Sequence, residues 1–452
     1  MNFELTKEFL DELRGAIKLG NQSFIQEKIS TLHPADLAEI LDQLDSEESI
    51  QFYQFLDKEI AGDVLVEMEE DVREKFLTQF TSKEIAQEFI ENMESDDAAD
   101  IISELPDSVK DEVISHIEDA EQASDIVDLL NYDEDTAGGL MAKELIAVNI
   151  NWSVQKCIKE VRKQAEEIED FYTTYVIDDR GKLLGLLSLK KLLLTPEEAK
   201  VSDIYKKDIV FVEASTSSEE VSNIMEKYDL VVVPVVDKLG RLLGRITIDD
   251  VVDVIKEEAE KDFQLASGIS EKVEHSDSVW ILSRSRLPWL LIGLLGGILG
   301  SRIIGNYESE IQIYPEMALF IPLIAAMGGN AGVQSSAIVV QGLANNSLGF
   351  TGILPKLFKE LLVGLVNGIV CSTIIFTYNF FLNDSFQLGL TVGIALISVI
   401  VFATILGTFV PLVLDKYDIN PALATGPFIT TMNDVSGLFI YFLAGHLLYI
   451  PH

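Results

Sequence analysis

The spacing of apolar residues predicts an all-helical beginning of the chain. Over residues 1 to about 135, apolar residues recur at helical spacing, and proline and glycine are scarce, as in amphipathic helices. A weak repeat, in which an alanine is followed by acidic and aliphatic residues, predicts short helices stacked into a small superhelix. The alanines that begin its copies are Ala38, Ala61, Ala86, Ala99 and Ala123.

A clearer repeat follows, with a pattern of strand, turn, strand and helix. Residues 176–189 match residues 235–248, and each copy places an Asp/Gly turn between two apolar runs, which is typical of paired strands. We expect a helix after each copy, over residues 190–194 and 249–255.

The helix after the second copy continues as a polar amphipathic segment over residues 249–265. Its face through Asp250, Asp253 and Glu257 is acidic. Because this segment joins the repeat to the apolar part of the chain, it is either a solvated linker or an element that transmits a signal.

Five apolar segments make up the remainder of the chain. Each is close to the roughly 20 residues that a helix needs to cross a bilayer, so the pattern predicts five membrane spans. They cover residues 287–305, 317–343, 355–382, 388–414 and 421–449.

Charge is distributed very unevenly between these parts. Residues 284–452 contain 6 Lys/Arg and 8 Asp/Glu, so that residues 1–283 carry 38 of the 40 net negative charges. Such an acidic front would repel the phosphates of nucleic acid, whereas divalent cations seek carboxylate oxygens. For most of these acids, solubility of the acidic surface is the better explanation.

The sequence predicts a membrane protein with its acidic front in the cytosol. The N-terminus has no signal-peptide pattern, and the two cysteines, Cys157 and Cys371, form neither a disulfide framework nor a zinc pattern. An odd number of spans then places the C-terminus outside. The positive-inside rule agrees, with Arg302 as an exception. The basic residues on the cytosolic side are Arg284, Arg286, Lys356, Lys359 and Lys416.

One carboxylate, Asp434, lies near the middle of the last apolar segment. An ionised side chain at that depth costs about 2.5–3.5 kcal/mol and normally marks a functional site. Asp434 is therefore either a cation site on a permeation path or a structural residue satisfied by neighbouring Thr, Asn and Ser side chains.

Two further stretches suit the wall of an aqueous path. The second segment contains Gly328, Gly329, Asn330 and Gly332, which permit either tight helix packing or a polar wall. The fifth segment begins with a proline- and glycine-rich break, and irregular backbone at membrane depth is tolerated in protein or beside water. The candidate pore-lining residues are Gly328, Gly329, Asn330, Gly332, Pro421, Thr425, Gly426, Pro427, Thr431 and Asn433.

The chain resembles the MgtE magnesium channels and transporters over nearly its whole length. Residues 132–141, 328–335 and 421–434 carry the resemblance. It implies a multidomain homodimer with an all-α N domain, an α/β tandem CBS pair, a connecting plug helix and an all-α membrane domain with five transmembrane helices. The expected domains are residues 1–135, 136–256, 249–283 for the plug helix and its linker, and 284–452.

The resemblance also implies magnesium sites. Asp434 of both subunits would bind a hydrated Mg²⁺ on the pore axis, and the acidic soluble part would bind further Mg²⁺. The chain departs from the family pattern at Asn420 and Lys261, where acids are common, and at Gln341, where arginine is common. The implied regulatory residues are Asp96, Asp100, Glu219, Asp249, Asp250, Asp253, Glu258 and Asp262.

CBS pairs often sense adenine nucleotides through a Ser/Thr-x-x-Asp step. The second copy retains this step as Thr247 and Asp250, whereas the first has Ser188 and Lys191. At most one nucleotide site is expected.

These observations predict a Mg²⁺-selective channel or transporter of the inner or plasma membrane that intracellular Mg²⁺ closes, and thus a role in Mg²⁺ homeostasis. An intramembrane aspartyl enzyme is disfavoured because no second acid lies inside a span; Glu360 lies at an end. The alternatives are a CBS-regulated transporter of another divalent cation or solute, and a membrane-tethered Mg²⁺ sensor.

Overall fold

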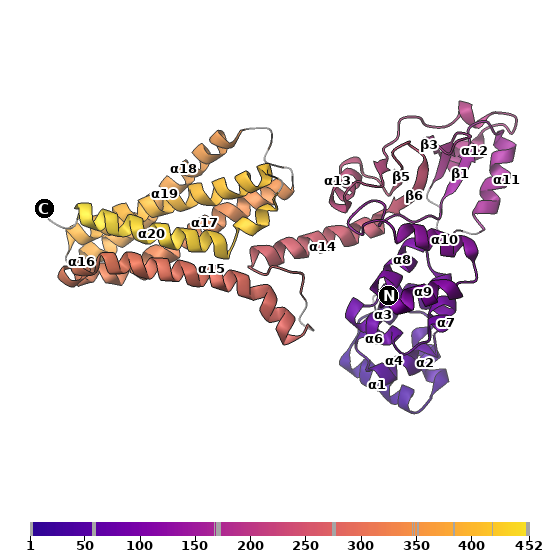
Figure 1. Ribbon diagram of the computed structural model, residues 1–452, viewed down its shortest axis with the longest axis horizontal. Coiled ribbons are helices and arrows are strands. Elements are labelled where there is room, and N and C mark those ends of the chain that lie inside the picture. The colour runs from indigo at the N-terminus through magenta and orange to yellow at the C-terminus, as the bar shows by residue number, and fades with distance from the viewer. Residues whose placement is uncertain are drawn as a thin grey trace. The chain divides into compact units, whose positions relative to one another are not determined.

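The computed structural model describes residues 3–56, 60–166, 168, 173–273, 277–345, 347, 349, 352–382, 385–417 and 419–448 (Figure 1). The chain forms two compact units, Met1–Ile255 and Lys256–His452. Each unit is described by itself below.

The first part of unit 1 is helical, as the apolar spacing predicts. Every alanine of the weak repeat lies on a helix: on α3, α5, the π-helical turn η2, α8 and α10. Side-chain caps set several helix starts, as where Asp45 accepts from the backbone N–H groups of Glu47 and Glu48. The helices are α1 (Lys7–Lys18), α2 (Gln22–Ile29), α3 (Pro34–Asp42), α4 (Ser46–Tyr53), α5 (Ala61–Val66), α6 (Glu70–Leu77), α7 (Ser82–Glu84), η2 (Ile85–Phe89), η3 (Ile90–Asn92), α8 (Ser95–Glu104), α9 (Asp107–His116) and α10 (Ala120–Leu129).

The second repeat forms two similar modules, each with a three-stranded sheet. In each, the first two strands pair in parallel and the last two antiparallel. The expected turns have Gly181 and Gly240 at φ of 78° and 77°, a conformation that glycine adopts readily. The elements are β1 (Ile146–Asn149), α11 (Val154–Gln164), β2 (Thr174–Ile177), β3 (Leu183–Leu187), α12 (Leu189–Leu194) and the 3₁₀ turn η4 (Val201–Asp203), then β4 (Val212–Glu213), α13 (Ser218–Tyr228), β5 (Val232–Val236), β6 (Leu242–Thr247) and α14 (Ile248–Ala266).

The two modules do not share one core. Buried Val233 and Ile246 of the second module and Val251 at the start of α14 belong to the core of the N-terminal helices. The first module has its own core around Val148 and Val176. The second module is therefore packed as an extension of the helical N-terminal part.

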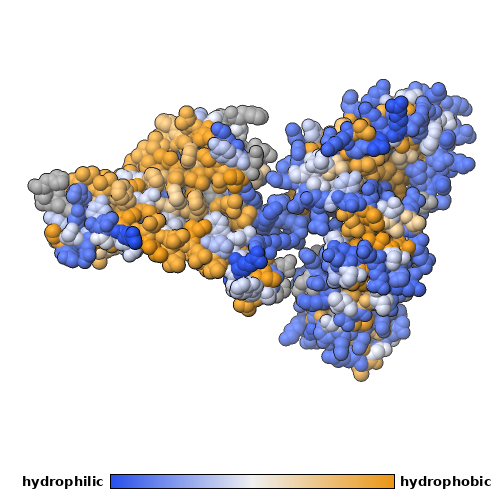
Figure 2. All heavy atoms as spheres, in the orientation of Figure 1, coloured by the Kyte–Doolittle hydropathy of each residue, from blue (hydrophilic) through white to orange (hydrophobic). Residues whose placement is uncertain are grey.

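In its described residues, unit 2 contains five helices that are long and apolar enough to cross a membrane, which agrees with the predicted five spans. Figure 2 shows that hydrophobic side chains occupy most of the visible face of the membrane helices in this unit. Helix α19 is its centre, because 61% of its apolar window is buried against 11% for α15 and α18. The elements are α15 (Val279–Asn306), α16 (Glu308–Ile313), the 3₁₀ turn η5 (Pro315–Phe320), α17 (Ile321–Ala344), α18 (Ile353–Leu382), α19 (Phe386–Lys416), the 3₁₀ turn η6 (Pro421–Ala424) and α20 (Pro427–Leu448).

Two span boundaries differ from the sequence prediction by more than five residues. Helix α15 begins at Val279, before the predicted span, because the Ser278 side chain accepts from the Ile281 N–H and caps the helix. The fifth span begins at Pro427 rather than residue 421, because η6 and Gly426 at φ 54° interrupt the chain.

Candidate functional site

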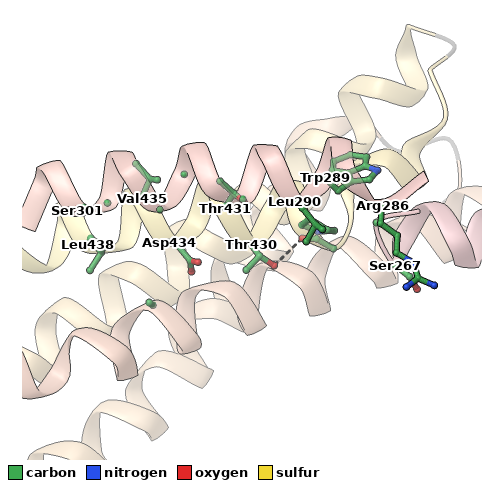
Figure 3. Close-up of a pocket in the computed structure, with 18 of the residues that line it drawn as sticks. Ser267, Arg286, Trp289, Leu290, Ser301, Thr430, Thr431, Asp434, Val435 and Leu438 are labelled. Atoms are coloured by element: carbon green, nitrogen blue, oxygen red, sulfur yellow. Dashed lines mark hydrogen bonds between the residues drawn. The ribbon is translucent and has the colours of Figure 1, made fainter. Parts of the chain in front are cut away.

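Asp434 lies half-buried on α20 and lines a cavity of about 1130 Å³ (Figure 3). The walls come mainly from α15 and α20, with Ala325 from α17. The end of α14 and the residues after it, Ala266–Ile269, line the same cavity. The cavity thus runs along two membrane-spanning helices and includes the one carboxylate predicted at membrane depth.

The Asp434 carboxylate is free to bind a ligand. Among the residues that the structure describes, none forms a hydrogen bond or ion pair with it. Its neighbour Thr430 instead donates its hydroxyl to the Gly426 carbonyl at 2.9 Å. In the described structure, neighbouring Thr, Asn and Ser side chains therefore do not satisfy Asp434, as the structural alternative would require.

Glycines of α15 line the same cavity as Asp434, and the sequence analysis missed them. A Cβ atom on Gly296 would lie 2.1 Å from Thr431 Cγ2, whereas one on Gly297 would meet nothing within 4 Å. Gly296 therefore allows α15 and α20 to approach closely. The sequence does contain a pattern that indicates such close helix packing, namely four glycines on one face of the helix. They are Gly293, Gly296, Gly297 and Gly300, and all four line the cavity.

The glycine-rich stretch of α17 packs mainly against other helices. Gly329 comes nearest to the carboxylate, because a Cβ there would lie 3.6 Å from Asp434 Oδ1. Gly328 packs against Val399 of α19, Gly332 packs against Asn433, and Asn330 is exposed on α17.

Asn433 does not line the cavity that contains Asp434. Its side chain is 1% exposed and lies against Gly332, where an added Cβ would be 1.9 Å from Nδ2. Both polar atoms of the amide lack a hydrogen-bond partner in the described structure.

The break before α20 brings the cavity to the end of α14. Thr425 is buried and donates its hydroxyl to the Ala422 carbonyl at 2.6 Å, so its hydroxyl is engaged within η6. A Cβ on Gly426 would lie 2.2 Å from the Ala266 carbonyl. Of the candidate pore-lining residues, Gly426, Pro427 and Thr431 line the cavity. Those outside its lining are Gly328, Gly329, Asn330, Gly332, Pro421, Thr425 and Asn433.

The end of α14 and the residues after it are hydrogen-bonded to the membrane part of unit 2. Asn420 Nδ2 donates to Asp262 Oδ1 at 3.0 Å. After the end of α14, the Ser270 N–H donates to the Ser285 carbonyl of α15 at 3.0 Å. The resemblance implies an acid at position 420. Asn420 stands there instead and is a hydrogen-bond donor to Asp262 of α14.

A second group of acids lies in unit 1, where the first turns of α8 and α14 meet. Burial, the largest cause, together with repulsion from neighbouring carboxylates that include Asp250, raises the pKa values of Asp97 and Asp100 to about 7. Burial likewise raises the pKa of Asp96 well above its usual range. The negative charges of Asp97 and Asp250 raise this pKa as well, by smaller amounts. Asp249 adds to the repulsion on Asp97 and Asp250. Clustered carboxylates that repel one another in this way are suited to a divalent cation.

Asp96 also belongs to a closer group that the sequence analysis missed. Ligand oxygens of Glu94, Asp96 and Glu144 lie within 4.8 Å of one another. Arg245 donates to both oxygens of Glu94 at 2.6 and 2.9 Å, and Ser95 donates to Glu144 through its N–H and hydroxyl. No sequence signal identifies Glu144, because it is far from Glu94 along the chain.

The other predicted regulatory residues are not gathered with these acids. Glu219 is exposed on α13, and Asp253 is exposed on α14. Glu258 pairs with Lys261 at 2.9 Å. Lys261 therefore neutralises an acid on the helix where the resemblance implies a further acid.

The predicted nucleotide residues contact each other. The N–H and hydroxyl of Thr247 both donate to Asp250 Oδ2, at 3.0 and 2.7 Å. Asp250 is thus shared between the predicted nucleotide step and the acidic cluster of unit 1.

Three family models match the chain. They are described as "Divalent cation transporter" (residues 321–444), "MgtE intracellular N domain" (residues 32–135) and "CBS domain" (residues 137–197 and 201–257). The fold class predicted from sequence agrees with these assignments.

Two curated relatives are magnesium transporters rather than enzymes. "Magnesium transporter MgtE" of Thermus thermophilus is 33% identical over 327 residues, 72% of each chain. The protein of that name from Enterococcus faecalis is 34% identical over 318 residues, 70% of each chain. A solved "cytosolic domain of the Mg2+ channel MgtE in complex with ATP" is 31% identical with a TM-score of 0.50, covering 54% of this chain and 99% of that chain.

Proposed function

Because the chain belongs to the MgtE family of divalent cation transporters, we propose that it conducts Mg²⁺ through the cell membrane and that cytosolic Mg²⁺ closes the path. The observation that carries the proposal is the unpartnered Asp434 carboxylate in a cavity between membrane-spanning helices. A carboxylate in that position costs free energy unless a cation or water meets it.

The ion would pass Asp434 with most of its water. Mg²⁺ gives up its hydration shell reluctantly and is usually held through one or two carboxylates. One Asp434 per chain is a weak site, whereas a two-fold axis would bring two such carboxylates to one ion. The proposed conducting form is therefore a homodimer.

No nucleotide hydrolysis is needed to drive uptake. A membrane potential contributes about 2.3 kcal/mol per charge per 100 mV, and hence about twice that for Mg²⁺. The acidic front of the chain would lie in the cytosol and the C-terminus outside, as the distribution of basic residues predicts.

The proposed gate is the helix α14. Its first turn carries Asp249 and Asp250, which belong to the acidic cluster of unit 1. Its last turn lies against Gly426, at the cavity. Mg²⁺ bound among the acids would remove their repulsion and fix the position of α14, which couples cytosolic Mg²⁺ to the pore.

Several weak sites together would be sufficient for this switch. Moving a two-state equilibrium from mostly open to mostly closed needs about 5.5 kcal/mol of differential binding. The proposed ligands include Asp96, Asp100, Asp249 and Asp250, with Glu94, Asp97 and Glu144 beside them. The other acids implied by the resemblance remain proposed ligands. Further carboxylates from other positions of the chain or from a second copy would complete their Mg²⁺ sites. These acids are Glu219, Asp253, Glu258 and Asp262.

A nucleotide is a proposed second ligand of the soluble part. The solved cytosolic domain of a relative was obtained "in complex with ATP", and this chain keeps Thr247 and Asp250. Because Asp250 also faces the acidic cluster, nucleotide and Mg²⁺ would act on a shared residue. A transporter of another divalent cation or solute and a Mg²⁺ sensor without flux are the alternatives.

Mg²⁺ uptake into proteoliposomes tests the proposal. We expect Asp434→Asn, which keeps the shape of the side chain, to abolish most uptake. Glu360→Gln is the matched control, because Glu360 lies on α18, outside the cavity lining, and bonds Ser335. Undiminished uptake by Asp434→Asn would refute the proposed path. No uptake by the wild type, with Mg²⁺ binding retained, would favour the sensor.

A further inference from the structure

Arg286 is a basic residue in the wall of the cavity that contains Asp434. It lies on α15 near Trp289, at the end of the cavity lined by Ser267. Figure 3 shows the Arg286 side chain extending from α15 toward Ser267, away from Asp434. A permanent positive charge thus lies at one mouth of a proposed cation path.

The guanidinium of Arg286 is not neutralised within the described part of the chain. It is exposed and makes no hydrogen bond or ion pair there. Arg284, two residues earlier on the same helix, pairs with Glu271 at 3.6 Å and does not line the cavity. The two arginines therefore differ in both position and pairing.

We propose that Arg286 makes the path rectify, by opposing the entrance of Mg²⁺ from the cytosolic mouth. This inference rests on the proposed function, because it requires that Mg²⁺ moves through this cavity. A doubly charged ion entering from the cytosol meets the uncompensated guanidinium first. An ion from outside reaches the same charge last, with the membrane potential driving it onward.

The charge acts at the mouth rather than at Asp434. Gly296 faces Thr431, one turn of α20 before Asp434. Arg286 precedes Gly296 by ten residues, about 15 Å along a helix. This exceeds the Debye length of about 8 Å at physiological ionic strength, so Arg286 should change entrance from the cytosol without changing Mg²⁺ binding at Asp434.

The alternative is that Arg286 only anchors α15 at the membrane surface, as cytosolic arginines commonly do. That role would be shared with Arg284, which is at the same end of the helix. Replacement of either arginine would then have the same effect on the protein.

Single-channel recording of the full chain in planar bilayers separates the two. The measured quantity is the amplitude of the current through one open channel in symmetrical Mg²⁺, at equal positive and negative voltages. This current amplitude does not depend on how often the gate opens. We expect Arg286→Gln to raise the outward amplitude about two- to fourfold, the size expected for a divalent ion passing one charge in screened, water-like surroundings. The inward amplitude should change much less.

Matched variants complete the test. Arg286→Lys should behave as the wild type, Arg284→Gln should leave both amplitudes unchanged, and an impermeant salt should shrink the effect of Arg286→Gln. Equal currents in Arg286→Gln and wild type, or equal changes in Arg284→Gln, would overturn the inference. If Asp434→Asn conducts normally, the proposed path itself fails; if it does not conduct and Arg286→Gln is unchanged, only the rectification fails.

Discussion

Gly296 offers a sharp test of how α15 and α20 pack around the cavity. An added Cβ would lie 2.1 Å from Thr431 Cγ2, which is well inside contact distance. Overpacking of this kind costs about 1–3 kcal/mol. Alanine also favours a helix over glycine by about 0.5–1 kcal/mol, so Gly296→Ala should destabilise unit 2 by up to about 2.5 kcal/mol.

Gly297 is the matched control, one position along the same helix. A Cβ there meets nothing within 4 Å, so Gly297→Ala should gain only the helix preference. The two variants should then differ by about 1–3 kcal/mol in unfolding free energy. At about 2–4 °C per kcal/mol, this corresponds to about 2–12 °C in the unfolding temperature of detergent-solubilised protein.

The same change should affect transport. Because Thr431 is three residues before Asp434, pushing its methyl group away displaces the turn that carries the carboxylate. We expect Gly296→Ala to slow Mg²⁺ uptake, and Thr431→Ser, which removes Cγ2 and keeps the hydroxyl, to restore both stability and uptake in the double variant. Equal unfolding temperatures for Gly296→Ala and Gly297→Ala would refute the reasoning.

Three further predictions concern other parts of the chain. The raised pKa values of Asp97 and Asp100, about 7, mean that folding favours their protonated forms. Stability in a Mg²⁺-free buffer should therefore fall as pH rises from about 4 to about 7 and then level off. Circular-dichroism melting should show this fall, and Asp97→Asn/Asp100→Asn should lose it, whereas a stability that rises with pH over this range would contradict it. Arg245→Ala should cost about 1.5–3 kcal/mol in a denaturant titration, because it removes the charged hydrogen bonds to Glu94, which is itself only partly buried; a loss below about 0.5 kcal/mol would show that solvent replaces the pair. Asn433→Leu should not lower the unfolding temperature, because both amide atoms are buried without partners, and a large decrease would mean that the amide has a partner in the membrane.

Hydropathy and turn chemistry were sufficient to predict most of the fold. The five spans follow from apolar length alone. The Asp/Gly turns identified the antiparallel strand pair of each sheet, because Gly181 and Gly240 need positive φ, but not the parallel strands β1 and β4 that complete the sheets. The break before α20 was visible in Gly426 and Pro427, although its exact extent depended on the 3₁₀ turn η6.

The site was less predictable because adjacent residues on a helix face different ways. Asp434 and Asn433 are neighbours in sequence, yet only Asp434 lines the cavity, and which face is buried depends on α17. Glu94 and Glu144, whose ligand oxygens lie within 4.8 Å of each other, come from the N-terminal helical part and from the segment that leads into β1. Sequence spacing carries no information on such a contact without the tertiary fold.

The shared core of the N-terminal helices and the second module bears on how the chain can be shortened. Val233, Ile246 and Val251 are buried in that core, so a truncated protein that begins near residue 136 would expose them to water. Val251 also belongs to the first turns of α14. Removing the N-terminal helices would therefore also disrupt the first turns of α14. Altered transport in such a protein could then arise from misfolding of α14 or from loss of the Mg²⁺-binding acids. Point substitutions of single carboxylates separate these two causes, whereas deletion of the domain does not.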